Sequence, residues 1–336
     1  MERVVKRSVV NWTSGAADIE TYLSAQVSDL SHREVVGPLK AAAGASGVVL
    51  VGGSEVAAWG DPDEPEMAFS VTKSVVSVVA GLAYDDGLLV PDQPVHEVLD
   101  VEQFRGPHNE RITWRHLLHQ SSQWEGELWG KPTRVDAQSY REGTEVHGTP
   151  PGEGWAYNDV RMNLLTYALT LLFRQSLAEV LRSRVMEPLA ASDHWSWHGY
   201  RTSKVELDGT SVEVVSGGAH WGGGLFIPAR DLALVGQLFL DHGMHGGVRV
   251  LSAEWVEQSW APCPIKPEYG YLWWLNDDGV PWPGAPSTGR SARGNAGRHL
   301  LWVDPARDLV LASHWTEEPL ALITDVSSAA SPRPWN

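Results

Sequence analysis

The sequence contains very little cysteine, because Cys263 is the single one among 336 residues. One thiol excludes an internal disulfide framework and the paired-cysteine spacings of zinc and redox sites. Long apolar runs are also missing, and no stretch approaches the roughly 18 uninterrupted apolar residues that a membrane-spanning helix needs. The first 15 residues carry basic side chains without the apolar segment of a secretory signal. We therefore expect a cytoplasmic protein.

Positive charge is scarce as well. Lys and Arg number 26 against 42 Asp and Glu, so the formal net charge is −16. Acidic surfaces repel phosphate backbones and anionic lipid head groups, which argues against nucleic acid and membranes as partners. The hydrophobic share of 43% is enough to bury a sizeable core. The composition favours a folded globular protein, and it does not indicate an oligomeric state.

Strand signals lie at both ends of the sequence, with helical signals between them. Two short strands at 48–51 and 55–59 are joined by a glycine-rich hairpin turn. Further strands are predicted at 269–275, 299–303 and 308–315, the last two as a hairpin. Helical spacing of apolar residues predicts helices at 70–86, 113–119, 159–173, 176–186 and 228–241. The simplest closure is a single domain with one antiparallel sheet from the two ends, about 1–60 and 265–336, and a helical lobe at about 61–264.

Ser70 and Lys73 stand three residues apart at the start of the helix predicted at 70–86. This spacing places both side chains on one helix face, within hydrogen-bond reach. A serine hydroxyl is a weak nucleophile and needs a base, and a lysine can be that base when burial or a neighbouring charge lowers its pKa. The helix start also directs the backbone N–H of Ser70 toward developing negative charge. The pattern predicts an acyl-serine enzyme, although a serine at a helix start is commonly only an N-cap.

Several blocks accompany this motif in a fixed order. They are Met67-Ala-Phe-Ser-Val-Thr-Lys-Ser74, Val79-Ala-Gly-Leu-Ala-Tyr-Asp-Asp-Gly-Leu-Leu89, Ile112-Thr-Trp-Arg-His-Leu-Leu-His-Gln-Ser-Ser122, Pro151-Gly-Glu-Gly-Trp-Ala-Tyr-Asn-Asp159 and Gly222-Gly-Gly-Leu-Phe-Ile-Pro-Ala-Arg-Asp231. Over about residues 45–315 the sequence resembles the class C β-lactamase-related serine hydrolases, which include D-aminopeptidases, esterases and 6-aminohexanoate-dimer hydrolases. The resemblance implies a mixed α/β (α+β) fold like that of β-lactamases and transpeptidases. It also implies cleavage of a small-molecule amide or ester through an acyl-Ser70 intermediate, without a metal or other cofactor.

The resemblance also assigns further site residues. Tyr157 matches the family's third catalytic residue, and a tyrosine beside a protonated lysine can pass a proton to a leaving group. Gly294 matches the glycine of the third motif, so the backbone N–H of Asn295 completes the oxyanion hole. Several tryptophans lie in or beside these blocks, and Trp124, Trp155 and Trp221 are the candidate cleft residues among them. They either form the wall of an acyl pocket or fill the space between the lobes.

Two departures from the family pattern bear on the substrate. Asp159 occupies the place of an asparagine, and we expect it to cap a helix, with binding of a cationic substrate group as the alternative. Ala292 occupies the place of a lysine or histidine that helps to hold a substrate carboxylate. Its neighbour Arg293 should face the opposite side of the strand. The missing cation disfavours β-lactam acids.

Four functions remain open. The favoured one is a serine amidase or esterase. The same acyl-enzyme would serve a transacylase, and β-lactamase or D-peptidase activity uses the same residues. The altered motifs also fit a binding protein that has lost catalysis. The acidic and histidine residues Asp193, His194 and His198 lack a third metal-ligand pattern, so we expect no metal site there.

Overall fold

The central sheet of the protein is assembled from the two ends of the chain. The computed structural model describes residues 44–133, 148–219 and 224–330. Six antiparallel strands follow the order β11-β12-β13-β14-β1-β2. Their bounds are β1 (Ser46–Val51), β2 (Ser54–Trp59), β11 (Trp274–Leu275), β12 (Arg290–Gly294), β13 (His299–Asp304) and β14 (Leu309–His314). Because β1 pairs with β14, with Val49 opposite Leu311, the predicted closure of the sheet from both ends is confirmed.

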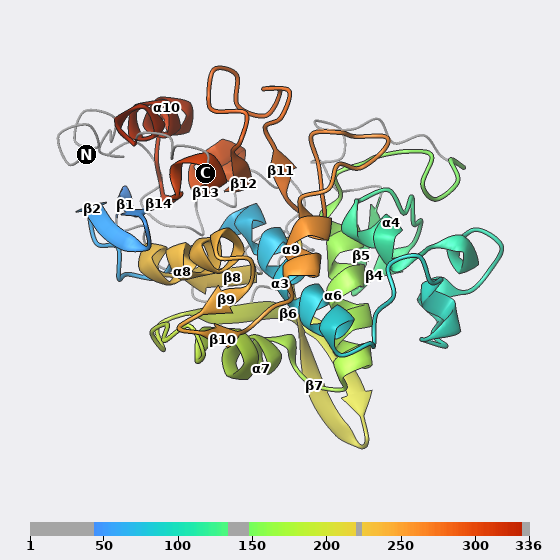
Figure 1. Ribbon diagram of the computed structural model, residues 1–336. Helices are drawn as coiled ribbons and strands as arrows, with labels where there is room; N and C mark the ends of the chain where they lie inside the picture. The colour runs from blue at the N-terminus through green and yellow to red at the C-terminus, as the bar shows by residue number, and fades with distance from the viewer. Residues whose placement is uncertain (1–43, 134–147, 220–223, 331–336) are drawn as a thin grey trace.

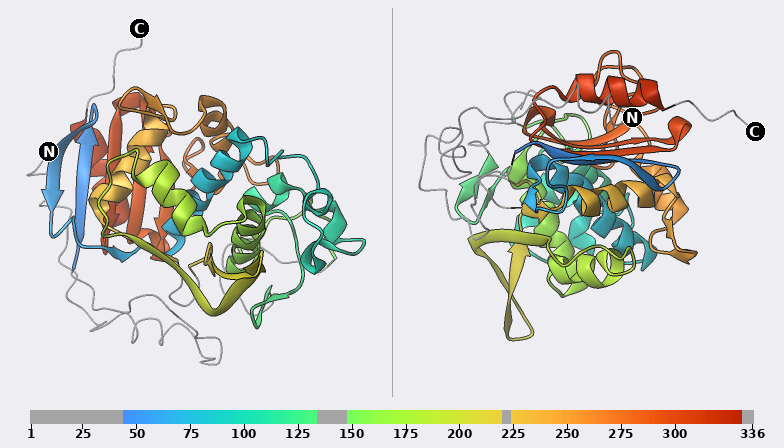
Figure 2. Two further views of the ribbon diagram at one scale, coloured as in Figure 1. Left: turned by 90° about the horizontal axis from the view of Figure 1, so that it is seen from below. Right: turned by 90° about the vertical axis from the view of Figure 1, so that its left-hand side faces the viewer.

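Each face of this sheet is covered by helices. Alternate residues of a strand point to opposite faces, so Val49 and Leu311 pack in one apolar cluster and Val48 in the other. Helix α10 (Pro319–Ala329) covers the first face, and α8 (Ala229–Leu240) with α3 (Thr72–Asp85) covers the second (Figure 2). The sheet is therefore buried on both sides, which explains its nearly continuous apolar strands.

Helix α3 lies at the centre of the molecule, between the sheet and the other helices (Figure 1). All its residues from Thr72 to Ala83 are buried, which agrees with a helix that is apolar on most sides. The remaining helices are α4 (Trp114–Leu118), α6 (Asp159–Phe173), α7 (Leu177–Leu181), continued by the π-helical turn η7 (Arg182–Met186), and α9 (Ala253–Ser259). Thr113 caps α4 as predicted, since its side chain accepts from the backbone N–H of His116.

The middle of the chain is less helical than predicted. It contains a second antiparallel sheet of four strands in the order β3-β8-β6-β7. These strands are β3 (Glu66–Met67), β6 (Ser196–Leu207), β7 (Thr210–Val215) and β8 (Gly224–Ile227). The sequence hides β6 because a register shift between Gly199 and Lys204 interrupts its alternation. Two short hairpins complete the fold: β4 (Glu127–Leu128) with β5 (Lys131–Pro132), and β9 (Met244–His245) with β10 (Val248–Arg249).

Three further details differ from the sequence-based expectation. Helix α8 packs on the central sheet, so it belongs with the strands although it precedes residue 265. Strand β11 contains only two residues, because the chain turns at Leu272, whose φ is 65°. Helix α10 was not expected at all.

Within the described ranges no single helix is long and apolar enough to cross a membrane. Helix α6 and the α7–η7 segment reach the required length only as a pair, which is bent by 74°.

Candidate active site

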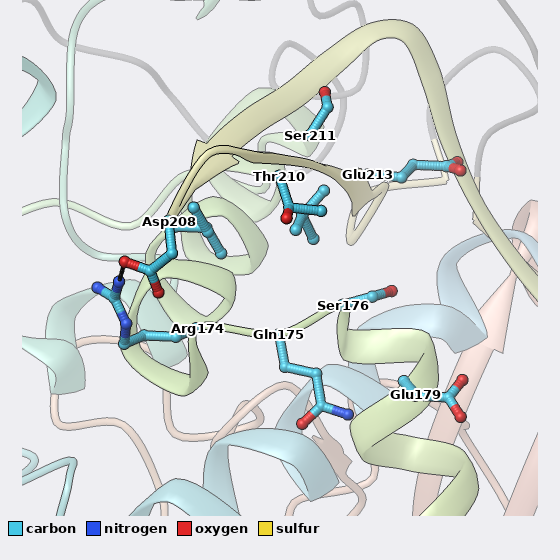
Figure 3. A pocket seen from close by; sticks show the side chains of 10 residues that line it. Arg174, Gln175, Ser176, Glu179, Asp208, Thr210, Ser211 and Glu213 are labelled. Atoms are coloured by element: carbon cyan, nitrogen blue, oxygen red, sulfur yellow. Dashed lines mark hydrogen bonds and ion pairs between the residues drawn. The ribbon is translucent and has the colours of Figure 1, made fainter.

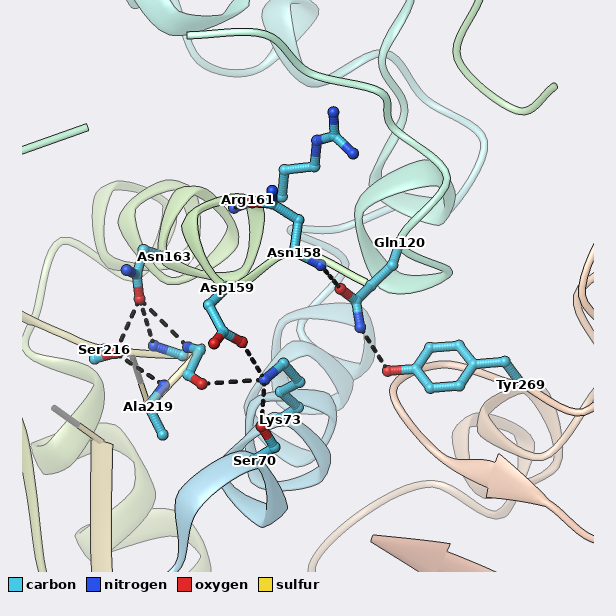
Figure 4. Close-up of polar contacts among 12 residues, drawn as sticks. Ser70, Lys73, Gln120, Asn158, Asp159, Arg161, Asn163, Ser216, Ala219 and Tyr269 are labelled. Atoms are coloured by element: carbon cyan, nitrogen blue, oxygen red, sulfur yellow. Dashed lines mark hydrogen bonds and ion pairs between the residues drawn. The ribbon is translucent and has the colours of Figure 1, made fainter. Parts of the chain in front are cut away.

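Ser70 lies on a short 3-10 turn, η2 (Phe69–Val71), that leads directly into α3. Phe69 adopts a φ of 49°, a left-handed conformation that is strained for a side chain of this size. The turn leaves Ser70 partly exposed, whereas Lys73, one helical turn further on, is 1% exposed. Lys73 Nζ donates to Ser70 Oγ at 2.8 Å (Figure 4). The predicted hydrogen-bond contact between these two side chains is thus present.

Lys73 has two further acceptors. Its Nζ donates to Asp159 Oδ1 at 2.5 Å and to the backbone carbonyl of Gly218 at 3.0 Å. The ammonium also lies over the aromatic face of Tyr157, with 4.5 Å between Nζ and the ring centroid. Three elements far apart in the sequence therefore meet at one nitrogen: α3, the N-terminus of α6 and the segment after β7.

Asp159 does not cap α6, so that prediction was wrong. The N-cap is Asn158, which has a φ of −140° and accepts from the backbone N–H of Arg161 at 3.0 Å. Asp159 is the first residue inside the helix, on the side that faces α3. Its carboxylate is buried against Lys73, not extended toward a cationic substrate group. The difference of one residue decides whether the carboxylate satisfies a helix end or a buried lysine.

The end of strand β12 lies against the nucleophile. A Cβ atom at Gly294 would come within 3.0 Å of the Ser70 backbone nitrogen and 2.6 Å of the Ala68 carbonyl oxygen. A side chain at this position would push the strand away from η2, which explains the glycine. The next residues, Asn295 and Ala296, both have left-handed φ values, 49° and 56°. Strain of this kind is often held at functional sites, and it follows the glycine that contacts Ser70.

Aromatic rings form a cluster beside Tyr157. The Tyr157 ring stacks on Trp274 with centroids 6.0 Å apart, and Trp155 lies 6.2 Å from Tyr157. Tyr269 packs edge-on to Trp274, and its hydroxyl accepts from Gln120 Nε2 at 2.8 Å. A cation also contacts the cluster, because the Arg293 guanidinium lies 3.8 Å from the Trp274 ring centroid. Arg293 and the core residue Ala292 leave β12 on opposite faces, as expected.

The three predicted cleft tryptophans have different positions. Trp155 lies beside Tyr157, as described above. Trp124 is buried within the helical lobe, where its Nε1 donates to the carbonyl of Gln103 at 2.8 Å. Its packing favours a structural role over contact with a substrate. Trp221 falls outside the described residues.

The described residues do not meet the requirements of a metal site. Among the residues described, no cluster of three or more His, Cys, Asp or Glu side chains could hold a metal ion. His198 instead pairs through its ring with the Ser196 hydroxyl at 2.9 Å.

Asn163 is a site residue that sequence reasoning missed. Its Oδ1 accepts from the Ser216 hydroxyl at 3.0 Å and from the backbone N–H groups of Gly217 at 3.1 Å and Gly218 at 3.3 Å. These bonds fix the segment whose carbonyl contacts Lys73 (Figure 4). A signal was available, since Asn163 follows Asp159 by four residues and so shares its helix face.

A buried histidine pair lies behind the nucleophile turn. His299 on β13 and His314 on β14 are fully buried, with 3.1 Å between their Nδ1 atoms, and the His299 ring packs 4.6 Å from that of Phe69. Burial lowers the pKa of His314 to about 4, although the Ile227 backbone acts in the opposite direction. Burial and the neighbouring His314 lower the pKa of His299 well below its usual value.

These histidines predict acid sensitivity of the fold. A pKa that is lower in the folded state than in the unfolded state means that the unfolded chain binds more protons as the pH falls below about 6.5. The contribution of these neutral histidines to the free energy of unfolding is therefore fully present above that pH and declines toward pH 4. For His314 alone we expect a loss of about 2 kcal/mol in the free energy of unfolding between pH 7 and pH 5. Urea unfolding at both pH values measures this loss. If His314→Gln loses as much stability between pH 7 and pH 5 as the wild type, His314 is not its cause.

The structure also has a hollow of about 530 Å³ away from these residues, between the end of α6 and the β6–β7 hairpin. Most of its lining residues are polar or charged, and Arg174 and Asp208 form an ion pair there (Figure 3). Its lining residues do not include Ser70, Lys73, Tyr157 or Asp159. We therefore do not assign catalysis to it.

Comparisons with known proteins agree with this geometry. The family model described as Beta-lactamase matches residues 32–321. The 6-aminohexanoate-dimer hydrolase of Paenarthrobacter ureafaciens is 26% identical over 315 residues, which span 80% of this chain and 73% of the relative. Among solved structures, one described as a putative β-lactamase from Bacteroides dorei has a TM-score of 0.63 at 17% identity, covering 92% of this chain and 98% of its own. A D-stereospecific amidohydrolase from Streptomyces sp. has a TM-score of 0.59 at 16% identity, covering 93% and 97%.

Proposed function

Because this chain belongs to the β-lactamase family, with hydrolase activity of the serine type, we propose that it cleaves a small-molecule amide or ester through an acyl-Ser70 intermediate. The observation that carries the proposal is the 2.8 Å hydrogen bond from buried Lys73 to the partly exposed Ser70 hydroxyl. A nucleophile and a proton-handling group within this distance are the minimum that acyl transfer requires.

The reaction proceeds in two acyl-transfer steps. Ser70 Oγ attacks the carbonyl carbon of the substrate while the hydroxyl proton passes to Lys73 Nζ. The backbone N–H groups of Ser70 and Asn295 stabilise the resulting oxyanion. The leaving group departs with a proton supplied through Tyr157, whose ring contacts the Lys73 ammonium. Water then releases the acyl group from Ser70 by the same path in reverse. The residues assigned here need neither a metal nor an organic cofactor.

The acyl group is proposed to be apolar or aromatic. Trp155, Tyr157 and Trp274 form an aromatic cluster that reaches Lys73 through Tyr157, and aromatic side chains favour apolar neighbours. The curated relative is named for hydrolysis of a 6-aminohexanoate dimer, which supports an open-chain amide substrate over a β-lactam ring. Ala292 supports the same choice, because it provides no cation at the strand position expected to hold a β-lactam carboxylate. Small intracellular amides are the substrates to screen first, and the cytoplasmic location stays a prediction.

A fluorophosphonate probe tests the nucleophile directly. We expect one covalent adduct per chain, located on Ser70 by peptide mass mapping, together with release of p-nitrophenol from short-chain p-nitrophenyl esters. The same intact-mass assay, applied to a library of amides with an added amine, separates hydrolysis from transfer to the amine. A folded protein that forms no adduct and releases no p-nitrophenol would instead support a binding protein that has lost catalysis.

A further inference from the structure

Lys73 makes four contacts that bear on its part in proton transfer. A lysine ammonium has three N–H donors and no acceptor, whereas a neutral amine has two donors and a lone pair. Three acceptors surround Nζ: Ser70 Oγ at 2.8 Å, Asp159 Oδ1 at 2.5 Å and the Gly218 carbonyl at 3.0 Å. The face of the Tyr157 ring, 4.5 Å away, also favours a cation. The Asp159 carboxylate and the ring face both favour the ammonium, whose third N–H group then donates to Ser70 Oγ.

An ammonium cannot take the proton of Ser70 unless it first gives one away. Asp159 is the group in contact that can receive it, because a carboxylate accepts a proton whereas a backbone carbonyl does not. Both members of the pair are buried, and a proton that passes from Lys73 to Asp159 neutralises both charges without creating a new one. The 2.5 Å separation between Nζ and Oδ1 is short enough for direct transfer.

We infer that Asp159 is the final proton acceptor for the nucleophile and that Lys73 relays the proton to it. This inference rests on the proposed function. In the step, an N–H bond of Lys73 breaks and an O–H bond forms on Asp159. The freed electron pair of Nζ then takes the proton of Ser70, and the Oγ electron pair forms the bond to the substrate carbonyl carbon. The carbonyl π electrons move to oxygen. Asp159 ends with one proton, Lys73 is again an ammonium, and the total charge is conserved.

The surroundings hold this relay in one geometry. Gly218 must lack a side chain, since a Cβ there would come within 2.6 Å of Asp159 Cβ. Asn163 fixes the Gly218 segment from the same helix that carries Asp159. Lys73 from α3 pairs with the carboxylate, and the Tyr157 ring lies 4.5 Å from the same Nζ atom. Arg161 directs its guanidinium away, donating to the carbonyl of Trp124 at 2.9 Å (Figure 4).

The test is the Asp159→Asn variant, because the amide keeps the shape and cannot accept a proton. The readout is the rate of fluorophosphonate labelling of Ser70 from pH 6 to pH 9. We expect the wild type to be nearly independent of pH over this range. The variant should be slower by about 10²-fold at pH 7. It should gain about tenfold per pH unit, because Lys73 must first lose its proton to solvent.

Matched variants make the outcome decisive. Asp159→Glu retains a carboxylate and should keep the wild-type pH dependence at a lower rate. Asp231→Asn removes another buried carboxylate, one on α8 that accepts from the backbone N–H and the hydroxyl of Ser192, and should not alter the pH dependence. If Asp159→Asn labels as fast as the wild type at pH 7, the relay is wrong while the nucleophile stands. If the wild type itself is not labelled on Ser70, the proposed function fails first.

Discussion

Replacing Ser70 with alanine is expected to lower kcat/KM on the best ester or amide substrate by at least about 10⁴-fold. The loss should appear in kcat, with KM unchanged. The reason is chemical: the acyl-enzyme cannot form without Oγ, and the remaining oxyanion donors support only a small residual rate. The fold should be unaffected, because Ser70 is partly exposed and its hydroxyl only accepts the Lys73 hydrogen bond. Steady-state kinetics on the purified variant, with its circular dichroism spectrum, measure both effects.

Ser74 provides the matched control for this variant. It lies four residues further along the chain, inside α3, and its hydroxyl donates to the carbonyl of Leu272 at 2.6 Å. Ser74→Ala leaves that buried carbonyl without this donor, so we expect a loss of about 1–3 kcal/mol in unfolding free energy. Its kcat should stay close to that of the wild type. Equal kinetic losses in the two alanine variants would show that the Ser70 effect is structural, and the assignment of the nucleophile would fall.

Replacing Lys73 with methionine is expected to damage stability and activity together. Methionine preserves the length of the side chain but leaves the Asp159 carboxylate buried without its cation. Removing one partner of a buried ion pair costs about 3–5 kcal/mol. The proton of Ser70 also loses its path, so kcat/KM should fall by about 10²–10⁴-fold. Urea unfolding at pH 7 and steady-state kinetics are the two measurements.

A double variant separates the two losses. In Lys73→Met with Asp159→Leu both charges are gone, and apolar side chains of similar size fill the space. Such replacements of buried ion pairs are often neutral for stability. We therefore expect stability to return to near the wild-type value while activity stays lost. A double variant as unstable as Lys73→Met would mean that the cost arises from packing at residue 73, not from the unpaired carboxylate.

Much of the core of the site could be predicted from the sequence because it depends on local geometry. Ser70 and Lys73 lie within one helical turn, so their spacing already fixes their distance. The start of α6 at Asp159 and the cap of α4 at Thr113 followed from residue type and periodicity. The family resemblance assigned Tyr157 to the active site, and in the structure its ring lies against the Lys73 ammonium.

What the sequence could not provide depends on residue pairs that are distant along the chain. The partner of Asp159 is decided by whether residue 158 or 159 occupies the N-cap, and both types are good caps. Gly218 and Asn163 enter the site only because β7 returns beside α6. The β6–β7 hairpin was missed although Asp208-Gly209 is a strong turn signal, because polar residues and a register shift obscure its alternation. Helix α10 was missed because its short apolar stripe follows directly on β14.

The pairing of β1 with β14 has a consequence for the order in which the chain can fold. The β1–β2 hairpin forms from neighbouring residues, but its partner strand β14 follows far later in the chain. Until then one edge of that hairpin stays unpaired, and closing so long a loop is entropically costly and slow. Strand β12, which lies against Ser70, arrives equally late. A nascent chain can thus form helix α3 with its serine and lysine well before it can stabilise an oxyanion, so chemical competence is the last property acquired during folding.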